Sequence, residues 1–229
     1  MDLQFSEFSF PAFMHPIWLS LQVAVIASSI AVVMGIWIGK LLARKQFRGK
    51  VFLETLLMIP MVLPPTVIGF LLLVIFGRNS AIGQAFEWFF GQSIVFTMPA
   101  AIIAATVVAF PLMYHAAKAG FSGVDESIEE AAKIDGANNW QVFLKVTMPL
   151  AKNSLVAGII LSFARALGEF GATFMFAGNI PGKTQTIPTA IYIALTSNQM
   201  MLAWLWVVVM IAISFSLLLV IQLRNREID

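Results

Sequence analysis

Two charged residues, Arg165 and Glu169, are the strongest candidates for chemistry in this sequence, because they stand inside an apolar run at residues 153–178. If the run is helical, residues four apart share a face, so the two side chains lie together. A charge near the centre of a bilayer costs ~3 kcal/mol or more on insertion scales, so both must face protein or a water-filled path. Two interpretations are open. Either the pair holds the helices together, or Arg165 lends positive potential to an anion path while Glu169 keeps the anion from binding tightly.

Glycines and prolines indicate where the backbone is unusual. Gly168 and Gly171 flank the acid and would allow neighbouring helices to approach closely. In another apolar run, MIPMVLPPTVIG, the interior Pro60, Pro64 and Pro65 remove backbone hydrogen bonds, so we predict a kink or a local break. A membrane tolerates such a break where the freed carbonyls face protein or a cavity, although kinked spans without a transport role are also common. The predicted pathway residues are Arg165, Glu169, Gly168, Pro64 and Pro65.

Other kinds of chemistry have little support in the sequence. Residues 178–184, GNIPGKT, resemble a phosphate-binding loop, but only three residues separate the two glycines where the motif requires four. The chain has no cysteine, and neither His15 nor His115 has the neighbours that would complete a metal site. No nucleophile stands beside a base in the apolar runs. We therefore expect no catalytic residue, no metal site and no bound cofactor, and we expect any ATP to be hydrolysed by another chain.

The composition places the chain in a membrane. Of its 229 residues, 59% are hydrophobic and 11% are charged, which is far outside the range of soluble globular domains. Crossing the hydrocarbon core takes about 20 apolar residues, and five runs qualify. These predicted spans cover residues 17–39, 55–76, 94–114, 153–178 and 200–221. We predict one all-α membrane domain over residues 1–229. We expect it to contact the lipid bilayer and to bind no nucleic acid.

The basic residues set the predicted orientation. Eleven of the fourteen Lys and Arg residues fall in the connections after the first and third spans and in the C-terminal tail. On the opposite side stand Arg78 and Lys183. Because cytoplasmic loops carry the excess of positive charge, the N-terminus is predicted outside and the C-terminus in the cytoplasm. The polar interval at residues 120–150 is then cytoplasmic.

That polar interval is typical of a hairpin of two short helices. Ser127 and Glu130 have the spacing of a capping box at a helix start, and Gly136 is suited to end that helix in the left-handed conformation. Asn138 predicts a second cap, with Gln141 three residues later. The apolar face of the second helix is predicted to contain Trp140, Phe143, Leu144 and Thr147. Pro149 is expected to close this helix. A polar hairpin with an apolar stripe is suited to bind a partner.

The hairpin also carries a family resemblance. Glu130, Ala131, Ala132 and Gly136, followed by a Met-Pro pair at 148–149, resemble the EAA loop of ABC importer permeases. In that family the loop forms a coupling helix that docks in a groove of the ATPase subunit. The resemblance therefore implies a type I ABC importer permease fold. The coupling residues that follow are Glu130, Ala131, Ala132 and Gly136, with Trp140 from the apolar face.

Two longer segments narrow the resemblance to one branch of the family. Residues 59–77, IPMVLPPTVIGFLLLVIFG, and 163–192, FARALGEFGATFMFAGNIPGKTQTIPTAIY, are similar to molybdate permease subunits. The ALGEFGA segment is shared with sulfate permeases, whereas GNIPGKTQTIPTAIY is closer to the molybdate branch, from which tungstate permeases are not separated. The resemblance implies a permease subunit that moves molybdate. Sulfate or tungstate are the alternatives, and a passive ion channel or a membrane enzyme are rivals from other classes.

The resemblance also implies an assembly. A homodimer of this chain would enclose the path at its axis, in the cytoplasmic membrane of a bacterium or archaeon. Two ATPase subunits, which bind ATP and Mg, would dock on the hairpins, and an external binding protein would deliver the oxyanion. The chain itself is then not an enzyme.

Overall fold

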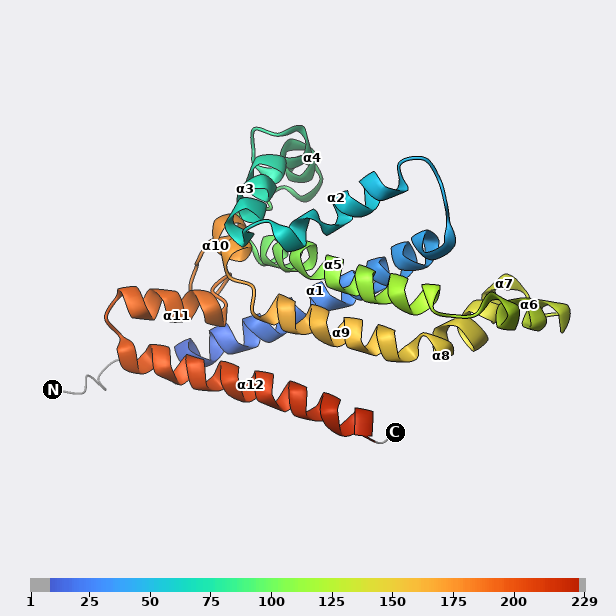
Figure 1. Ribbon diagram of the computed structural model, residues 1–229. Helices are drawn as coiled ribbons and strands as arrows, with labels where there is room; N and C mark the ends of the chain where they lie inside the picture. The colour runs from blue at the N-terminus through green and yellow to red at the C-terminus, as the bar shows by residue number, and fades with distance from the viewer. Residues whose placement is uncertain (1–8, 227–229) are drawn as a thin grey trace. The chain divides into compact units, whose positions relative to one another are not determined.

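The computed structural model describes residues 9–226, with side chains described to residue 219. Within this range every regular element is a helix, so the predicted all-α class is confirmed (Figure 1). In chain order the helices are α1 (Phe10–Arg44), α2 (Lys50–Val62), α3 (Pro65–Phe76), α4 (Ala81–Phe90), α5 (Met98–Ser122), α6 (Glu126–Ile134), α7 (Asn139–Val142), the π-helical turn η2 (Phe143–Thr147), α8 (Met148–Leu150), α9 (Lys152–Leu167), α10 (Gly171–Ala177), α11 (Ile187–Thr196) and α12 (Met200–Arg226).

The chain forms two compact units, each assembled from segments that are distant in the sequence. Unit 1 contains Met1–Val25, Pro64–Ala105 and Leu167–Asp229, and unit 2 contains Ile26–Leu63 and Thr106–Ala166. Two of the boundaries coincide with helix ends, because α2 ends at Val62 and α9 ends at Leu167. The break after α2 and the break after α9 therefore also lie at boundaries between the units.

In unit 2, glycines allow α5 to pack closely against its neighbours. A Cβ atom at Gly35 of α1 would lie 2.6 Å from Cγ of Met113, and one at Gly158 of α9 would lie 2.7 Å from Cβ of Ala116. Lipid tails are as apolar as leucine, so contacts between small residues, rather than the removal of apolar surface from water, hold such helices together. A larger residue at either glycine would force the helices apart.

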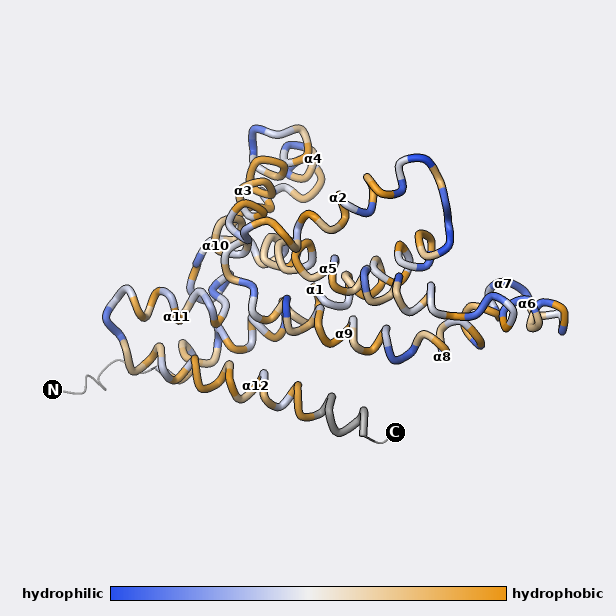
Figure 2. The backbone as a smooth tube through the Cα atoms, in the orientation of Figure 1, coloured by the Kyte–Doolittle hydropathy of each residue, from blue (hydrophilic) through white to orange (hydrophobic). Residues whose placement is uncertain are grey.

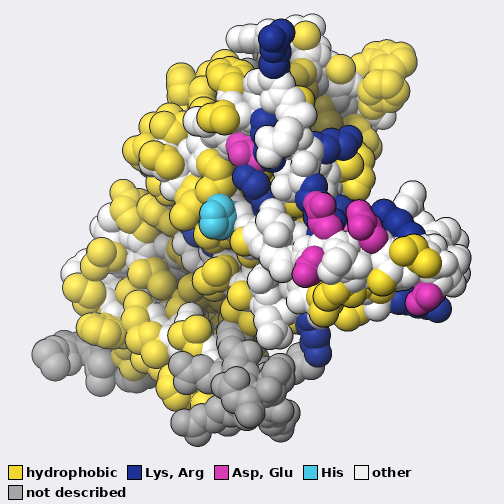
Figure 3. All heavy atoms as spheres, turned by 45° about the vertical axis from the view of Figure 1, so that its right-hand side comes forward, with side chains coloured by type: hydrophobic (Ala, Val, Ile, Leu, Met, Phe, Trp, Pro, Cys, Tyr) yellow, Lys and Arg dark blue, Asp and Glu magenta, His cyan; other side chains and the backbone are white. Residues whose placement is uncertain are grey.

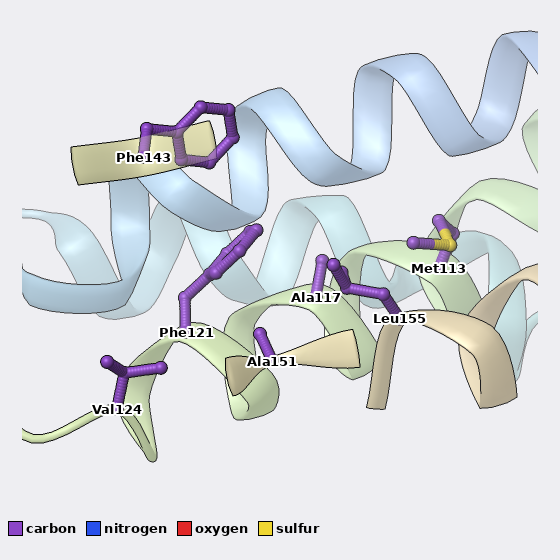
Figure 4. Packing of buried hydrophobic residues seen from close by; sticks show 7 residues of the cluster. All are labelled: Met113, Ala117, Phe121, Val124, Phe143, Ala151 and Leu155. Atoms are coloured by element: carbon purple, nitrogen blue, oxygen red, sulfur yellow. The ribbon is translucent and has the colours of Figure 1, made fainter. Parts of the chain in front are cut away.

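The buried core of unit 2 joins the polar hairpin to the long helices. Figure 4 shows Phe121 of α5 pointing toward Phe143 of η2, and their ring centroids are 6.0 Å apart. The cluster consists of Met113, Ala117, Phe121, Val124, Phe143, Ala151 and Leu155. The hairpin therefore starts from a packed base instead of hanging as a free loop.

Unit 1 contains two closely packed helix pairs. A Cβ atom at Gly69 of α3 would lie 2.8 Å from the carbonyl oxygen of Ala172 in α10, so these two backbones nearly touch. Helices α11 and α12 enclose a second core with α1, where Trp206 Nε1 donates to the carbonyl of Phe13 at 3.1 Å. The amide of Ile187, at the start of α11, donates to Ser20 Oγ at 2.7 Å.

Apolar helices overlap three of the predicted spans, and the other two runs are each divided between helices. Among the described residues, three helices are long and apolar enough to cross a membrane (α1, α5 and residues 200–219 of α12). Five candidates result when two bent pairs, α2 with α3 and residues 139–150 with α9, each count as one span. The break predicted at Pro64 and Pro65 is confirmed by the ends of α2 and α3, while Pro60 lies inside α2. The single helix expected over 153–178 is wrong, because residues 168–170 are not helical.

Hydropathy follows this arrangement of elements. Figure 2 shows hydrophilic residues concentrated in the α1–α2 connection and in the α6–α7 hairpin, whereas α3 and α12 are mostly hydrophobic. In α12, large side chains such as Trp204, Val208 and Ile211 are exposed. Such an apolar surface is suited to lipid or to another membrane helix.

Candidate functional site

The first half of the hairpin is a short helix with both ends capped. Asp125 is the N-cap of α6, and its Oδ1 accepts from the amide of Ser127 at 2.9 Å. This bond holds the pKa of the exposed Asp125 carboxyl below its ordinary value. The capping box predicted from Ser127 and Glu130 is wrong, because Asp125 takes the cap position two residues earlier and places both residues inside the helix.

Gly136 ends α6 as the sequence predicts. Its φ is +91°, which only glycine adopts cheaply. The amide of Gly136 donates to the carbonyl of Lys133 and that of Ala137 to the carbonyl of Ala132, each at 3.0 Å. These two bonds form a Schellman motif, which satisfies carbonyls that the helix end would otherwise leave unpaired.

The second half begins with the predicted cap at Asn138, which forms a capping box with Gln141. Asn138 Oδ1 accepts from the amide of Gln141, and Gln141 Oε1 accepts from the amide of Asn138, both at 2.9 Å. The helix does not close at Pro149 as expected. It continues to Leu150 and bends by 75° into α9. The turn before Pro149 is a π turn, in which the Met148 amide donates to the carbonyl of Phe143.

The predicted apolar face divides into an inner and an outer part. Phe143 and Thr147 are buried, whereas Trp140 and Leu144 are 66% and 46% exposed. In α6, Ile134 is 86% exposed. Among the other predicted coupling residues, Glu130, Ala131 and Gly136 are exposed and Ala132 is half-buried. Seen from the hairpin side, Figure 3 shows a hydrophobic patch with acidic and basic side chains gathered around it. Large apolar side chains exposed on a polar element are typical of a protein-binding surface.

The structure brings some of the predicted pathway residues together in unit 1. Pro65 is the first residue of α3, and a Cβ atom at Gly171, the first residue of α10, would lie 3.0 Å from its Cβ. Glu169 is 2% exposed, and its Oε1 accepts from the amide of Ala172 at 2.8 Å. Pro64 and Gly168 are exposed beside these helix starts. The N-terminal ends of α3 and α10, each of which follows a break in an apolar run, therefore meet.

Arg165 lies in a different position from the one that the sequence suggests. It stands half-buried in the last turn of α9, in unit 2, and that helix ends two residues later. Glu169 follows the helix end and belongs to unit 1. The expectation that Arg165 and Glu169 share one helical face is therefore wrong. The roles of both charges in an anion path stay a prediction.

Sequence reasoning missed the helix α11. Residues 178–186 before it are not helical, and Thr184 and Thr186 in this segment and Thr189 in α11 are buried. Thr184 Oγ1 accepts from the amide of Ile180 at 2.9 Å, which closes a tight turn. The TIPT sequence contained the missing signal, since a threonine followed by a proline at the second helical position is typical of a helix start.

Solved structures show which class of membrane protein has this fold. The chain is similar to a subunit of the MetNI methionine ABC transporter in inward-facing conformations, with a TM-score of 0.70 and 17% identity over 97% of this chain and 100% of that chain. It is also similar to a chain of an amino acid ABC transporter, with a TM-score of 0.66 and 18% identity over 99% and 100% of the two chains. The fold is therefore that of ABC importer permeases.

Sequence comparison identifies the family. The chain belongs to the binding-protein-dependent transport system inner membrane components, whose family model matches residues 31–229. This confirms the resemblance drawn from the EAA loop. It also makes the chain a component of an inner-membrane transport system.

Individual relatives share most of the chain. YvgM of Bacillus subtilis (strain 168), which is named for molybdenum transport, is 55% identical over 97% of this chain and 98% of its own length. The molybdenum transport system permease protein ModB of Escherichia coli (strain K12) is 45% identical over 76% of each chain. The sulfate transport system permease protein CysW of Synechococcus elongatus is more distant, at 35% over 81% of this chain and 65% of its own length.

Proposed function

We propose that this chain is the membrane-spanning permease subunit of an ATP-driven ABC importer that moves molybdate across the cytoplasmic membrane. The structural observation that carries the transport role is the capped hairpin, which presents Ile134 and Trp140 to solvent in a fold of importer permeases. The proposed cargo follows from the relatives, because the two that are named for molybdenum transport are 55% and 45% identical to this chain over the aligned residues, against 35% for a sulfate permease.

The assembly that we propose contains two copies of this chain, two ATPase subunits and an external binding protein. The family description itself names dependence on a binding protein. ATP and Mg would be bound by the ATPases, which would dock on the exposed side of the cytoplasmic hairpins. Closure of the ATPases would displace the hairpins and switch the two chains between inward-open and outward-open forms.

The pathway that we propose runs beside the broken helices α3 and α10. Broken helices are a recurring way to place polar backbone at membrane depth, provided that the break lines protein or a cavity. Arg165 would contribute positive potential, and the carboxylate of Glu169 would keep that potential from holding a dianion tightly. Weak binding suits a permease, because the binding protein supplies the affinity and a tightly held ion would be released slowly.

Uptake of labelled molybdate tests this function. Cells that lack the chain are compared with complemented cells, in the presence of excess sulfate or excess tungstate. We expect uptake to depend on the chain, to resist sulfate and to be inhibited by tungstate, whose oxyanion has nearly the same size. Uptake that sulfate abolishes would assign the chain to the sulfate alternative, and uptake unchanged by deletion would contradict the transport of molybdate.

A further inference from the structure

The inner side of the hairpin is tied to the end of α1 by one arginine. Arg44, the last residue of α1, donates through Nη2 to the carbonyl of Val124 at 2.7 Å. Its Nη1 donates to Oε2 of Glu129, and its Nε lies 3.4 Å from Oε1 of Glu126. Arginine is suited to this role, because its planar group directs several donors at different acceptors. One side chain therefore connects the α1 terminus with the start of α6 and with its first turn.

Glu129 continues this connection into the second half of the hairpin. Its other carboxylate oxygen, Oε1, accepts from the hydroxyl of Thr147 in the π turn. The side chain of Glu129 is only 14% exposed, against 68% for Glu126, and Thr147 is 5% exposed. An ion pair at the surface contributes little, but a shielded carboxylate that loses its partners is costly. Glu129 is thus the central member of an Arg44–Glu129–Thr147 network.

A second contact joins the same elements one turn earlier in α1. Nζ of Lys40 lies 3.3 Å from the centroid of the Phe143 ring, in the position of a cation–π interaction. Ser122 at the end of α5 also donates to the carbonyl of Ala43 at 3.4 Å. The last turn of α1 therefore contacts the base of the hairpin at several points on different segments.

These contacts assign different tasks to two adjacent acids. Glu130, the acid of the EAA motif, is exposed, whereas Glu129 faces inward. The backbone connects the hairpin directly to α5 through Val124 and to α9 through Ala151. It does not connect the hairpin directly to α1. The network supplies that missing link through side chains.

We propose that Glu129 is a positioning residue that transmits displacement of the hairpin to α1, and that it is not a docking residue. This inference rests on the proposed function, since it assumes that a partner moves the hairpin. Without the link, the partner would still bind the exposed side of the hairpin and hydrolyse ATP. Part of its motion would then be lost as rotation of the hairpin relative to α1.

The test is the amount of molybdate moved for each ATP hydrolysed, measured in proteoliposomes that contain the complete complex. For Glu129→Gln, which keeps the shape and removes the charge, we expect the ATPase to copurify normally and the ratio to fall by roughly threefold or more. Thr147→Val removes the hydroxyl without changing a charge and should lower the ratio in the same direction. In an Arg44→Gln background, Glu129→Gln should add little, because both act through one contact.

Glu87→Gln is the matched control. It removes a carboxylate from a more exposed ion pair with Arg78, at 3.9 Å in unit 1, and should leave the ratio unchanged. Loss of ATPase copurification in Glu129→Gln, or a wild-type ratio in both Glu129→Gln and Thr147→Val, would overturn the positioning role. Failure of the wild-type complex to move molybdate would instead contradict the proposed function, so the two failures are distinguishable.

Discussion

The carboxylate of Glu169 accepts a hydrogen bond from the backbone amide of Ala172 at 2.8 Å, so a buried acid caps the start of α10. The first amides of a helix have no partner within the helix, and a negative charge there is also favoured by the helix dipole. Glu169 therefore has a structural role at the start of α10. It stabilises the break between α9 and α10, whatever else it does for an anion.

Substitution of Glu169 separates the cap from the charge. Glu169→Gln keeps an acceptor for the Ala172 amide, so we expect a stability close to that of the unmodified chain. Glu169→Ala removes the acceptor and should lower stability by about 1 kcal/mol, the usual value of a helix cap. Thermal unfolding of the purified chain in detergent measures both. Equal losses for Gln and Ala would mean that the charge, and not the cap, is what the fold requires.

The break at residues 168–170 shows where sequence reasoning ended. No proline marks it, and the run was predicted as one helix. The break depends on tertiary contacts instead, namely the close approach of Gly171 to Pro65 and the burial of Glu169. By contrast, the α2–α3 break and the Asn138 cap were predictable, because proline chemistry and i,i+3 capping are local.

The hairpin shows the same division between local and distant information. Asp125 and Ser127 are both good N-cap residues, and local rules do not choose between them. The structure selects Asp125. The link between Arg44 and Glu129 joins residues 85 positions apart, and no pattern in the sequence announces it.

Arg165→Ala tests whether this charge serves transport or only the fold. If Arg165 lends potential to a path, uptake should fall about tenfold or more, as expected for a lost charge contact, while the folded yield in detergent falls much less. Arg165→Lys should retain part of the uptake. Arg78→Ala, which removes an arginine with a 73% exposed side chain in unit 1, serves as the control. Equal losses of uptake and folded yield in Arg165→Ala would support a purely structural role.

Gly136→Val tests the hairpin as the coupling element. At φ +91° a β-branched residue is strained by about 1–2 kcal/mol, and the end of α6 should be displaced. We expect loss of ATPase copurification or of uptake, with normal membrane insertion. Gly49→Val is a close control, because Gly49 has φ +94° and, like Gly136, has open space around it, but it lies outside the hairpin. Normal uptake in Gly136→Val would contradict the coupling role of the hairpin.

Asp125 predicts a pH dependence of α6. Because the Ser127 amide lowers the pKa of this carboxyl in the folded chain, its contribution is fully present above the unfolded value and is lost as the pH falls through the folded one. Amide exchange of α6, corrected for the intrinsic rate at each pH, should therefore increase below the ordinary value of 3.8. Asp125→Asn retains the cap without titrating, so its exchange should not show this step. If both proteins show the same increase in exchange, it arises from another titrating group. The acidic partners of Arg44 would then be tested next.

Gly69→Ala tests whether the two broken helices must touch. The added Cβ would lie 2.7 Å from Cβ of Met175 and 2.8 Å from the carbonyl oxygen of Ala172, and the backbone oxygen has no rotamer by which to move away. We expect a loss of about 1–3 kcal/mol in stability from overpacking, and a loss of uptake because Pro64, Pro65, Gly168 and Glu169 lie at or just before the starts of α3 and α10. Gly123→Ala is the control, since its Cβ would meet no atom closer than 3.5 Å. If Gly69→Ala unfolds and transports as the control does, the close contact between α3 and α10 is not required, and the proposed path beside them loses its structural support.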